Sequence, residues 1–238
     1  MKQSLLILHG ALGSAAQLSQ WKNTLSTKFD CHTFDFSGHG PRSAEKDNFS
    51  IELFVEDLKK FISEKNLMQP HVVGYSMGGY VALFCALQNE NLLGNIMTIA
   101  TKFDWSPESS RKEAGYLKPE IMLQKVPKLA QQLKERHGDD WEKVVNKTAA
   151  MMLILGTAPN ITRDNIGHIK NKVKFCVGDK DKMVSMEETI GVYRCAANAD
   201  LCVLPATAHL PETMNLNRIV FEAEEFLLNS ATAQGAPR

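Results

Sequence analysis

The sequence has no excess of charge of either sign. Its 238 residues include 27 lysines and arginines and 27 aspartates and glutamates, so the formal net charge is zero. A balanced charge produces no long-range field that would attract a nucleic acid or an anionic membrane. We therefore expect a small-molecule partner, and no nucleic-acid or membrane partner.

Long apolar runs are also missing. The sequence contains no uninterrupted apolar stretch of about 18 residues, the length that a membrane-spanning helix requires. The first apolar run, Leu5 to Leu8, is too short to be the apolar part of a signal peptide. These absences predict a soluble protein that is not exported.

Cysteine is scarce and forms no recognisable pairing pattern. The five cysteines include no Cys-x-x-Cys pair and lie mostly in apolar stretches. This distribution favours buried free thiols over disulfides. We therefore expect the protein to be in a reducing compartment, the cytoplasm.

The most informative stretch runs from Val72 to Leu83 and has the pattern of a strand, a sharp turn and a helix. Its centre is a Gly-x-Ser-x-Gly pentapeptide with Ser76 in the middle. In this context the pattern predicts a nucleophile elbow, in which two glycines allow a tight turn that presents the serine hydroxyl above the sheet edge. The pentapeptide alone is a weak signal, and it becomes strong if the chain also supplies a base, an acid and oxyanion donors.

The rest of the chain alternates between strand-like and helix-like segments. Apolar strand-like runs are expected at residues 5–8, 31–34, 72–75, 93–100, 173–177 and 201–204. Helices are expected at residues 15–26, after Ser50, after Ser76, and at residues 186–196 and 215–228, and the helix after Ser50 has a one-sided apolar stripe. This alternation predicts an α/β fold with a doubly wound, mostly parallel six-stranded sheet.

Residues 101–172 differ in character, because they are rich in charge and helix formers and lack strand-like runs. We interpret them as a helical cap, or lid, inserted into a core made of residues 1–100 and 173–238. Apolar residues of the cap, Met151 and Met152 among them, form its own small core or the wall of a lipophilic pocket. The small polar tail at residues 230–238 is expected to be a poorly ordered terminus.

A serine hydroxyl needs a base, and the base needs an orienting carboxylate. His209 is the only histidine that follows a predicted strand in the last third of the chain, and we predict that it is the base. The loop after the fifth strand offers two acids, Asp181 and Asp179. We prefer Asp181, because an aspartate directly after Gly178 is suited to capping the turn. Asp104 is a third, less favoured acid.

The oxyanion hole should combine two backbone N–H groups. One belongs to Met77, directly after the nucleophile, and the other to Ala11, in the loop after the first strand. His9 in the same loop could serve as a second base, but a structural hydrogen-bonding role is favoured.

These motifs together resemble the α/β-hydrolases with an inserted helical cap. The matching segments are His9-Gly10, the loop from Asp35 to Ser43, which reads Asp-x-x-Gly-x-Gly-x-x-Ser, the elbow at residues 74–79, Gly178-Asp179-x-Asp181, and His209. The resemblance implies the shortened, six-stranded form of the fold. A serine at the elbow disfavours haloalkane dehalogenase and epoxide hydrolase reactions, and Tyr80 stands where the menaquinone-pathway lyase of this group has arginine.

The sequence therefore predicts a serine hydrolase of the carboxylesterase kind that cleaves a small ester or thioester without a cofactor or metal. Ser76 would be the nucleophile, His209 the base, Asp181 the orienting acid, and Ala11 and Met77 the oxyanion donors. Cleavage of a C–C bond, perhydrolysis on the same triad, and slow-turnover ligand reception remain alternatives, because they share the fold.

Overall fold

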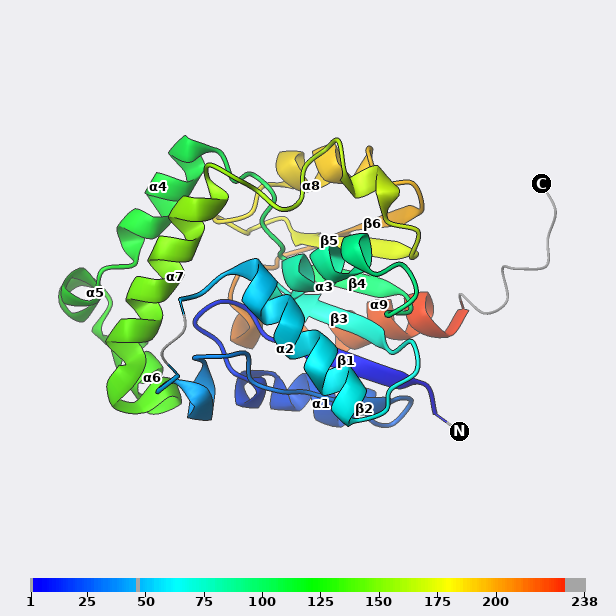
Figure 1. The fold of residues 1–238 in the computed structure, drawn as a ribbon, viewed down its shortest axis with the longest axis horizontal. Helices are drawn as coiled ribbons and strands as arrows, with labels where there is room; N and C mark the ends of the chain where they lie inside the picture. The colour runs from blue at the N-terminus through cyan, green and yellow to red at the C-terminus, as the bar shows by residue number, and fades with distance from the viewer. Residues whose placement is uncertain (1, 46–47, 230–238) are drawn as a thin grey trace.

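A six-stranded parallel sheet runs through the centre of the protein, in a computed structural model that describes residues 2–45 and 48–229 (Figure 1). Its strand order is β2-β1-β3-β4-β5-β6, and each neighbouring pair is parallel. The strands are β1 Ser4–Leu8, β2 Asp30–His32, β3 His71–Tyr75, β4 Ile96–Ile99, β5 Val173–Gly178 and β6 Ala199–Leu204.

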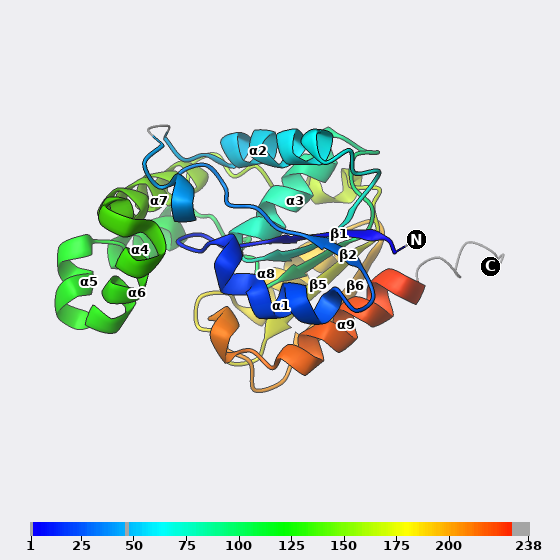
Figure 2. The same ribbon diagram turned by 90° about the horizontal axis from the view of Figure 1, so that it is seen from below.

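Helices cover both faces of the sheet, which is why the central strands are almost wholly apolar. In Figure 2, α2 (Ile51–Glu64) and α3 (Met77–Gln88) lie on one face, and α1 (Ser19–Leu25) and α9 (Leu216–Asn229) lie on the other. Helix α8 (Met186–Tyr193) contributes Val192 to the same buried core as α2 and α3. Short 3-10 turns lie at Ala15–Leu18, Gly40–Arg42, Gly138–Asp140, Ile166–His168 and Pro211–Thr213.

Several helices begin where the sequence supplies a capping signal. The Ser50 hydroxyl accepts a hydrogen bond from the Leu53 N–H at the start of α2. Ser185 and Glu188 form a reciprocal capping box at the start of α8. Such caps satisfy backbone N–H groups that have no partner within the helix.

Four helices between β4 and β5 lie beyond the carboxyl ends of the strands (Figures 1 and 2). They are α4 (Pro107–Tyr116), α5 (Pro119–Lys125), α6 (Pro127–His137) and α7 (Trp141–Leu155), and we call them the insertion helices. Three of them begin at a proline, which is pre-organised for the first helical position.

The insertion helices contribute to two apolar cores. A small core of their own contains Leu133 of α6 and Trp141 of α7. The last turns of α7, with Met151 and Leu155, instead join the large core that α2 and α3 share with the sheet. After α7 the chain returns to the sheet, where the Ile161 N–H donates to the Tyr80 hydroxyl at 2.9 Å. Helix α7 is therefore anchored to the sheet more firmly than α5.

This architecture confirms the predicted α/β fold and its six strands. The predicted strand at residues 93–100 is shorter in the structure, where β4 is Ile96–Ile99. Leu93 is buried without pairing in the sheet, and the Asn95 N–H donates to the His71 ring. Apolar burial therefore starts before strand pairing, and the two signals cannot be separated in the sequence. The predicted domain boundaries at residues 100 and 173 stay a prediction.

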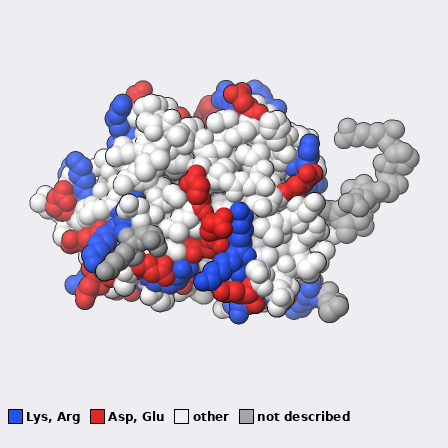
Figure 3. All heavy atoms as spheres, in the orientation of Figure 1, with Lys and Arg blue, Asp and Glu red and all other residues white. Residues whose placement is uncertain are grey.

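The surface mixes charges of both signs. On the face in Figure 3, basic and acidic side chains lie interspersed. All five cysteines fall within the described residues and are free thiols; four are buried and Cys195 is exposed. In residues 2–45 and 48–229, no helix has the length and apolar character needed to cross a bilayer. The tail at residues 230–238 lies outside the described residues.

Candidate active site

The turn between β3 and α3 holds Ser76 in a conformation that few residues adopt. Its φ is 50° and its ψ is −116°, so the side chain leaves a strained, left-handed turn. A Cβ atom at Gly74 would lie 2.5 Å from the backbone nitrogen of Gly79, so only glycine allows α3 to approach the strand this closely. The Ser76 N–H still pairs with the Ile99 carbonyl, at 2.8 Å. The elbow geometry therefore follows from its local sequence.

Three side chains predicted from the sequence lie together at this edge of the sheet. Ser76 Oγ is 3.4 Å from His209 Nε2, and His209 Nδ1 is 2.8 Å from Asp181 Oδ2. The ring of His209 belongs to the loop after β6, and Asp181 belongs to the loop after β5. With Nδ1–H donating to the carboxylate, Nε2 is left as the acceptor that faces the serine hydroxyl.

Backbone contacts fix the direction of the Asp181 carboxylate. Its Oδ1 accepts hydrogen bonds from the N–H groups of Met183, at 2.8 Å, and Val184, at 2.9 Å. Burial acts to raise the pKa of Asp181, but the hydrogen bonds from His209, Val184 and Met183 outweigh it, and the pKa is lowered. The carboxylate therefore stays ionised, with Oδ2 directed at His209.

The two other candidate acids lie elsewhere. Asp179 Oδ1 accepts from the Thr207 N–H at 3.2 Å, and its Oδ2 pairs with Lys180 at 3.3 Å. It thus ties the loops after β5 and β6 together, as expected of a residue that caps the turn. Asp104 accepts from the Ser106 N–H at 3.3 Å. Of the three acids, only Asp181 makes a hydrogen bond to His209 among the described residues.

Ala11 and Met77, the two predicted oxyanion donors, lie beside Ser76. Both residues line the same narrow cavity as the serine. Within the described ranges, neither N–H donates a hydrogen bond to the protein. Met77 is the first residue of α3, whose N-terminal end carries partial positive charge. One donor at the helix N-terminus and one in the loop after β1 could together stabilise a negative oxygen beside Ser76.

Three buried histidines connect the insertion to the loops below it. His9 Nε2 accepts from the Phe36 N–H at 3.1 Å, so His9 supports the loop after β2. His137 at the end of α6 accepts from the Gly40 N–H through Nδ1 at 2.9 Å and donates through Nε2 to the Leu12 carbonyl at 3.0 Å. The ring of His39 lies between them, with centroids 5.2 Å from His9 and 5.9 Å from His137. Because backbone N–H groups can only donate, His9 and His137 must be neutral here.

This histidine cluster makes stability depend on pH. Burial lowers the pKa of His9 to about 4 and that of His137 to about 4, and it lowers the pKa of His39 as well. A lowered pKa means that the unfolded chain binds protons more readily, so the free energy of unfolding should fall as the pH drops from about 6.5 toward 4. The shift at His137 corresponds to about 3 kcal/mol. Urea unfolding at a series of pH values measures this loss.

His137→Gln should flatten this pH dependence, since glutamine has no proton to gain in the same range. The matched control is His32→Gln, which removes a histidine from β2 at the protein surface. Equal slopes for the wild type and His137→Gln would rule out His137 as a source of the effect.

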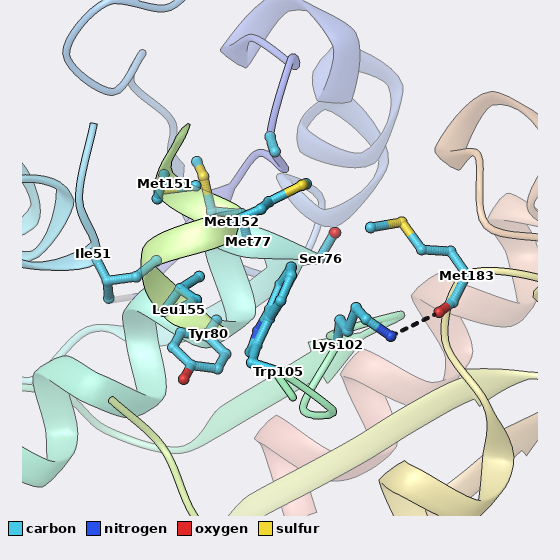
Figure 4. A pocket seen from close by; sticks show the side chains of 11 residues that line it. Ile51, Ser76, Met77, Tyr80, Lys102, Trp105, Met151, Met152, Leu155 and Met183 are labelled. Carbon is cyan, nitrogen blue, oxygen red and sulfur yellow. Dashed lines mark hydrogen bonds between the residues drawn. The ribbon is translucent and has the colours of Figure 1, made fainter. Parts of the chain in front are cut away.

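Ser76 forms part of the wall of two cavities of different size. The narrow cavity has a volume of about 30 Å³, and apolar side chains such as Met151 and Leu155 dominate its wall (Figure 4). The wide cavity has a volume of about 420 Å³ and extends under α4 and α6. His209 lines the wide cavity and is not among the residues of the narrow one. Ser76 therefore borders two cavities of unequal size.

Sequence reasoning missed much of the cavity walls. Lys102 and Trp105, which follow β4, lie beside Ser76, as does Met183 in the loop after Asp181. Ile51 at the start of α2 also reaches the narrow cavity. The only signal in the sequence was the position of Lys102 and Met183 just after strands, where loops converge. In the described ranges, no cluster of three or more His, Cys, Asp or Glu residues could hold a metal ion.

The sequence matches the α/β-hydrolase fold family over residues 3–145, more than half of the chain. The protein belongs to this family. The fold is also similar to that of an enol-lactonase from Burkholderia xenovorans LB400, with a TM-score of 0.79, 15% identity, and coverage of 96% of this chain and 92% of the other. A meta-cleavage product hydrolase from Pseudomonas fluorescens IP01 superposes with a TM-score of 0.75 at 18% identity, over 96% and 91% of the two chains.

Curated relatives match shorter stretches. A pimeloyl-[acyl-carrier protein] methyl ester esterase from Vibrio cholerae is 29% identical over 108 residues, which are 45% of this chain and 40% of the esterase. The chain covers less than half the length of the curated relatives that it matches. The family and its hydrolase members together support a hydrolase.

Proposed function

We propose that the protein is a serine hydrolase that cleaves a small carboxylic ester or thioester through an acyl-enzyme on Ser76. The observation that carries the proposal is the line of contacts from Ser76 Oγ through His209 to the ionised Asp181. The 3.4 Å between Ser76 and His209 is longer than a strong hydrogen bond, as is common for catalytic contacts without substrate.

In the proposed reaction, Ser76 Oγ attacks the substrate carbonyl carbon and His209 Nε2 takes the hydroxyl proton. The carbonyl oxygen becomes an oxyanion that accepts hydrogen bonds from the Ala11 and Met77 N–H groups. When the bond to the leaving group breaks, His209 returns the proton to the departing alcohol or thiol. A water then attacks the acyl-enzyme with His209 as base, and the acid and free Ser76 are released.

The two cavities suggest how the substrate is oriented. Because His209 must protonate the leaving group, that group belongs in the wide cavity, which His209 lines. The acyl group then belongs in the narrow cavity, next to Met77 and Met151. The proposal therefore favours short acyl groups with larger leaving groups.

Covalent trapping combined with turnover tests the mechanism. A chromogenic acetate ester should add one acetyl group to Ser76, detectable by mass spectrometry after rapid quenching, and the enzyme should then turn over many times. A single stoichiometric release of chromophore without turnover would instead indicate a slow ligand receptor. Hydrolysis of a vinylogous diketone faster than of any ester would favour the C–C bond hydrolase alternative.

Acyl-length preference provides a separate prediction about the cap. Met151→Phe should fill the narrow cavity and lower kcat/KM for butyryl esters relative to acetyl esters by about tenfold or more. The matched control is Leu129→Phe, because Leu129 lines only the wide cavity. An unchanged chain-length profile in Met151→Phe would contradict the assignment of the acyl group to the narrow cavity.

The packing of the insertion helices refines the proposed lid. Met151 belongs to the large core, whereas α5 packs mainly against α6 and α7. We therefore expect α5 and α6 to be the part that opens, because local opening follows the elements with the least apolar burial. Hydrogen exchange at residues 119–137 as slow as in the strands would contradict a moving lid.

A further inference from the structure

The narrow cavity contains a buried cation. Lys102 follows β4, and its side chain is only 6% exposed although it lines the cavity beside Ser76. Among the described residues that line this cavity, Lys102 is the only one with a charged side chain. A lysine is rarely buried to this degree unless partners compensate its charge. The partners of Lys102 therefore determine whether the ammonium can serve a ligand.

The protein uses only part of the hydrogen-bonding capacity of this ammonium. Lys102 Nζ donates to the Met183 carbonyl at 3.2 Å, and its nearest carboxylate oxygen, Oε2 of Glu188, is 3.6 Å away. An ammonium has three donors, so among residues 2–45 and 48–229 this arrangement leaves donors without a close acceptor. Contact with the Trp105 ring, whose centroid is 5.8 Å from Nζ, adds attraction but no hydrogen bond.

Glu188 is itself occupied by other donors. Its Oε1 accepts from the Phe103 and Asp104 N–H groups, at 2.8 and 3.1 Å. Its Oε2 accepts from the N–H and hydroxyl of Ser185, at 3.0 and 3.1 Å. These four donors stabilise the Glu188 charge at the start of α8 without help from Lys102. The Glu188 carboxylate therefore has four hydrogen-bond donors of its own besides the Lys102 ammonium.

Trp105, which lines the same cavity, also has a donor without a partner among the described residues. Trp105 is only 9% exposed, and its buried indole nitrogen has no acceptor among the described residues. In Figure 4, Trp105 stands between Tyr80 and Lys102 in the wall of the cavity. A buried N–H group without a partner is costly, and an acceptor from a bound ligand would remove that cost.

We propose that Lys102 selects acyl groups that end in a carboxylate, so that the preferred substrates are half-esters of short dicarboxylic acids. This inference rests on the proposed serine hydrolase function and on the assignment of the acyl group to the narrow cavity. The substrate carboxylate accepts hydrogen bonds from the Lys102 ammonium, in an otherwise apolar wall that strengthens the charge pairing. The small volume of the narrow cavity, about 30 Å³, favours the shortest chains between the two carbonyl carbons.

A pair of isosteric esters tests the selection. Monobenzyl succinate carries the carboxylate, and benzyl isocaproate replaces it with an isopropyl group of similar shape. The wild type should have a kcat/KM for the succinate ester about tenfold or more above that for the isocaproate ester, mainly through a lower KM. Lys102→Met should lower this ratio by about 10- to 100-fold, as expected for a lost hydrogen bond to a charged group. Lys102→Arg should restore part of it.

Glu188→Gln is the matched control, because it removes the nearest carboxylate but leaves the ammonium. It should preserve or raise the preference for the succinate ester. A purely structural Lys102 would predict that Lys102→Met and Glu188→Gln affect both esters alike, with an unchanged ratio, and that result would overturn the proposal.

The wild type alone can also overturn it, even if Lys102→Met does not fold. A ratio near one, or a preference for the isocaproate ester, would exclude carboxylate selection while leaving the hydrolase mechanism intact. Failure to cleave either ester, or equal activity of Ser76→Ala, would instead refute the proposed function itself.

Discussion

Ser76→Ala should lower kcat for ester hydrolysis by about 10³- to 10⁶-fold, because alanine has no hydroxyl to form the acyl-enzyme. The oxyanion donors and the cavities remain in this variant, so binding of substrate should change little. Steady-state kinetics on a short-chain ester, with KM and kcat determined separately, provides the measurement.

Folding must be controlled in the same experiment. The Ser76 hydroxyl points toward His209 and makes no other hydrogen bond among the described side chains, so the thermal unfolding midpoint should move little. Ser14→Ala is a matched control, since Ser14 is also a buried serine, and it should keep near wild-type kcat. Near wild-type kcat in Ser76→Ala would refute the nucleophile assignment.

Asp181→Asn should have the second largest effect, a loss of kcat of about 10⁴-fold. Asp181 accepts three hydrogen bonds, from His209, Met183 and Val184, and it uses both oxygens to do so. Asparagine has only one acceptor oxygen, so either the loop amides or the His209 Nδ1–H lose their partner. In both cases His209 is no longer held with Nε2 free to accept the Ser76 proton.

Asp179→Asn is the informative comparison, because the residue is only two positions away in the same loop. Its Oδ1 accepts from Thr207, and an asparagine oxygen can do the same. We expect kcat to fall by no more than a few-fold. Were Asp179→Asn to lose more kcat than Asp181→Asn, the acid would have been assigned to the wrong residue.

The fold could be predicted because its signals are local. Continuous apolar runs such as Leu5 to Leu8 occur where helices cover both faces of a sheet, and the burial of these residues in β1 shows the same cause. The elbow is equally local, since Gly74 is required by the close approach of Gly79 within the same turn. Boundaries were less accurate, because burial of Leu93 does not require strand pairing.

The residues of the candidate triad could be named, but their relative positions could not. Both Asp179 and Asp181 follow β5, and the choice between them depends on which way the loop turns. In the structure the turn is set by contact with the loop after β6: a Cβ atom at Gly178 would lie 2.1 Å from the Thr207 carbonyl oxygen. No pattern in the sequence predicts that long-range contact between Gly178 and Thr207. The catalytic roles of Ser76, His209 and Asp181 remain predictions until the variants are measured.

The residues that line the cavities could not be predicted from the sequence, for a related reason. Ile51, Lys102, Met151 and Met183 come from four distant segments, and only the packing of the insertion helices against the sheet brings them together. No periodicity or spacing connects such residues. Lys102 in particular would pass for a surface lysine in a charged stretch, because its burial depends on Met183 and α8, about 80 residues away.

The contacts of α6 with Leu12 have a further consequence. Arg136 donates to the Leu12 carbonyl at 2.7 Å and His137 to the same oxygen at 3.0 Å, one residue beyond the Ala11 amide. If α6 moved away, the loop that presents Ala11 would lose both restraints, and transition-state stabilisation would weaken together with closure. We therefore expect an open enzyme to be catalytically idle. With such coupling, Ser76 would react efficiently only while the insertion helices enclose the substrate. The insertion helices would then contribute to catalysis in addition to covering the active site.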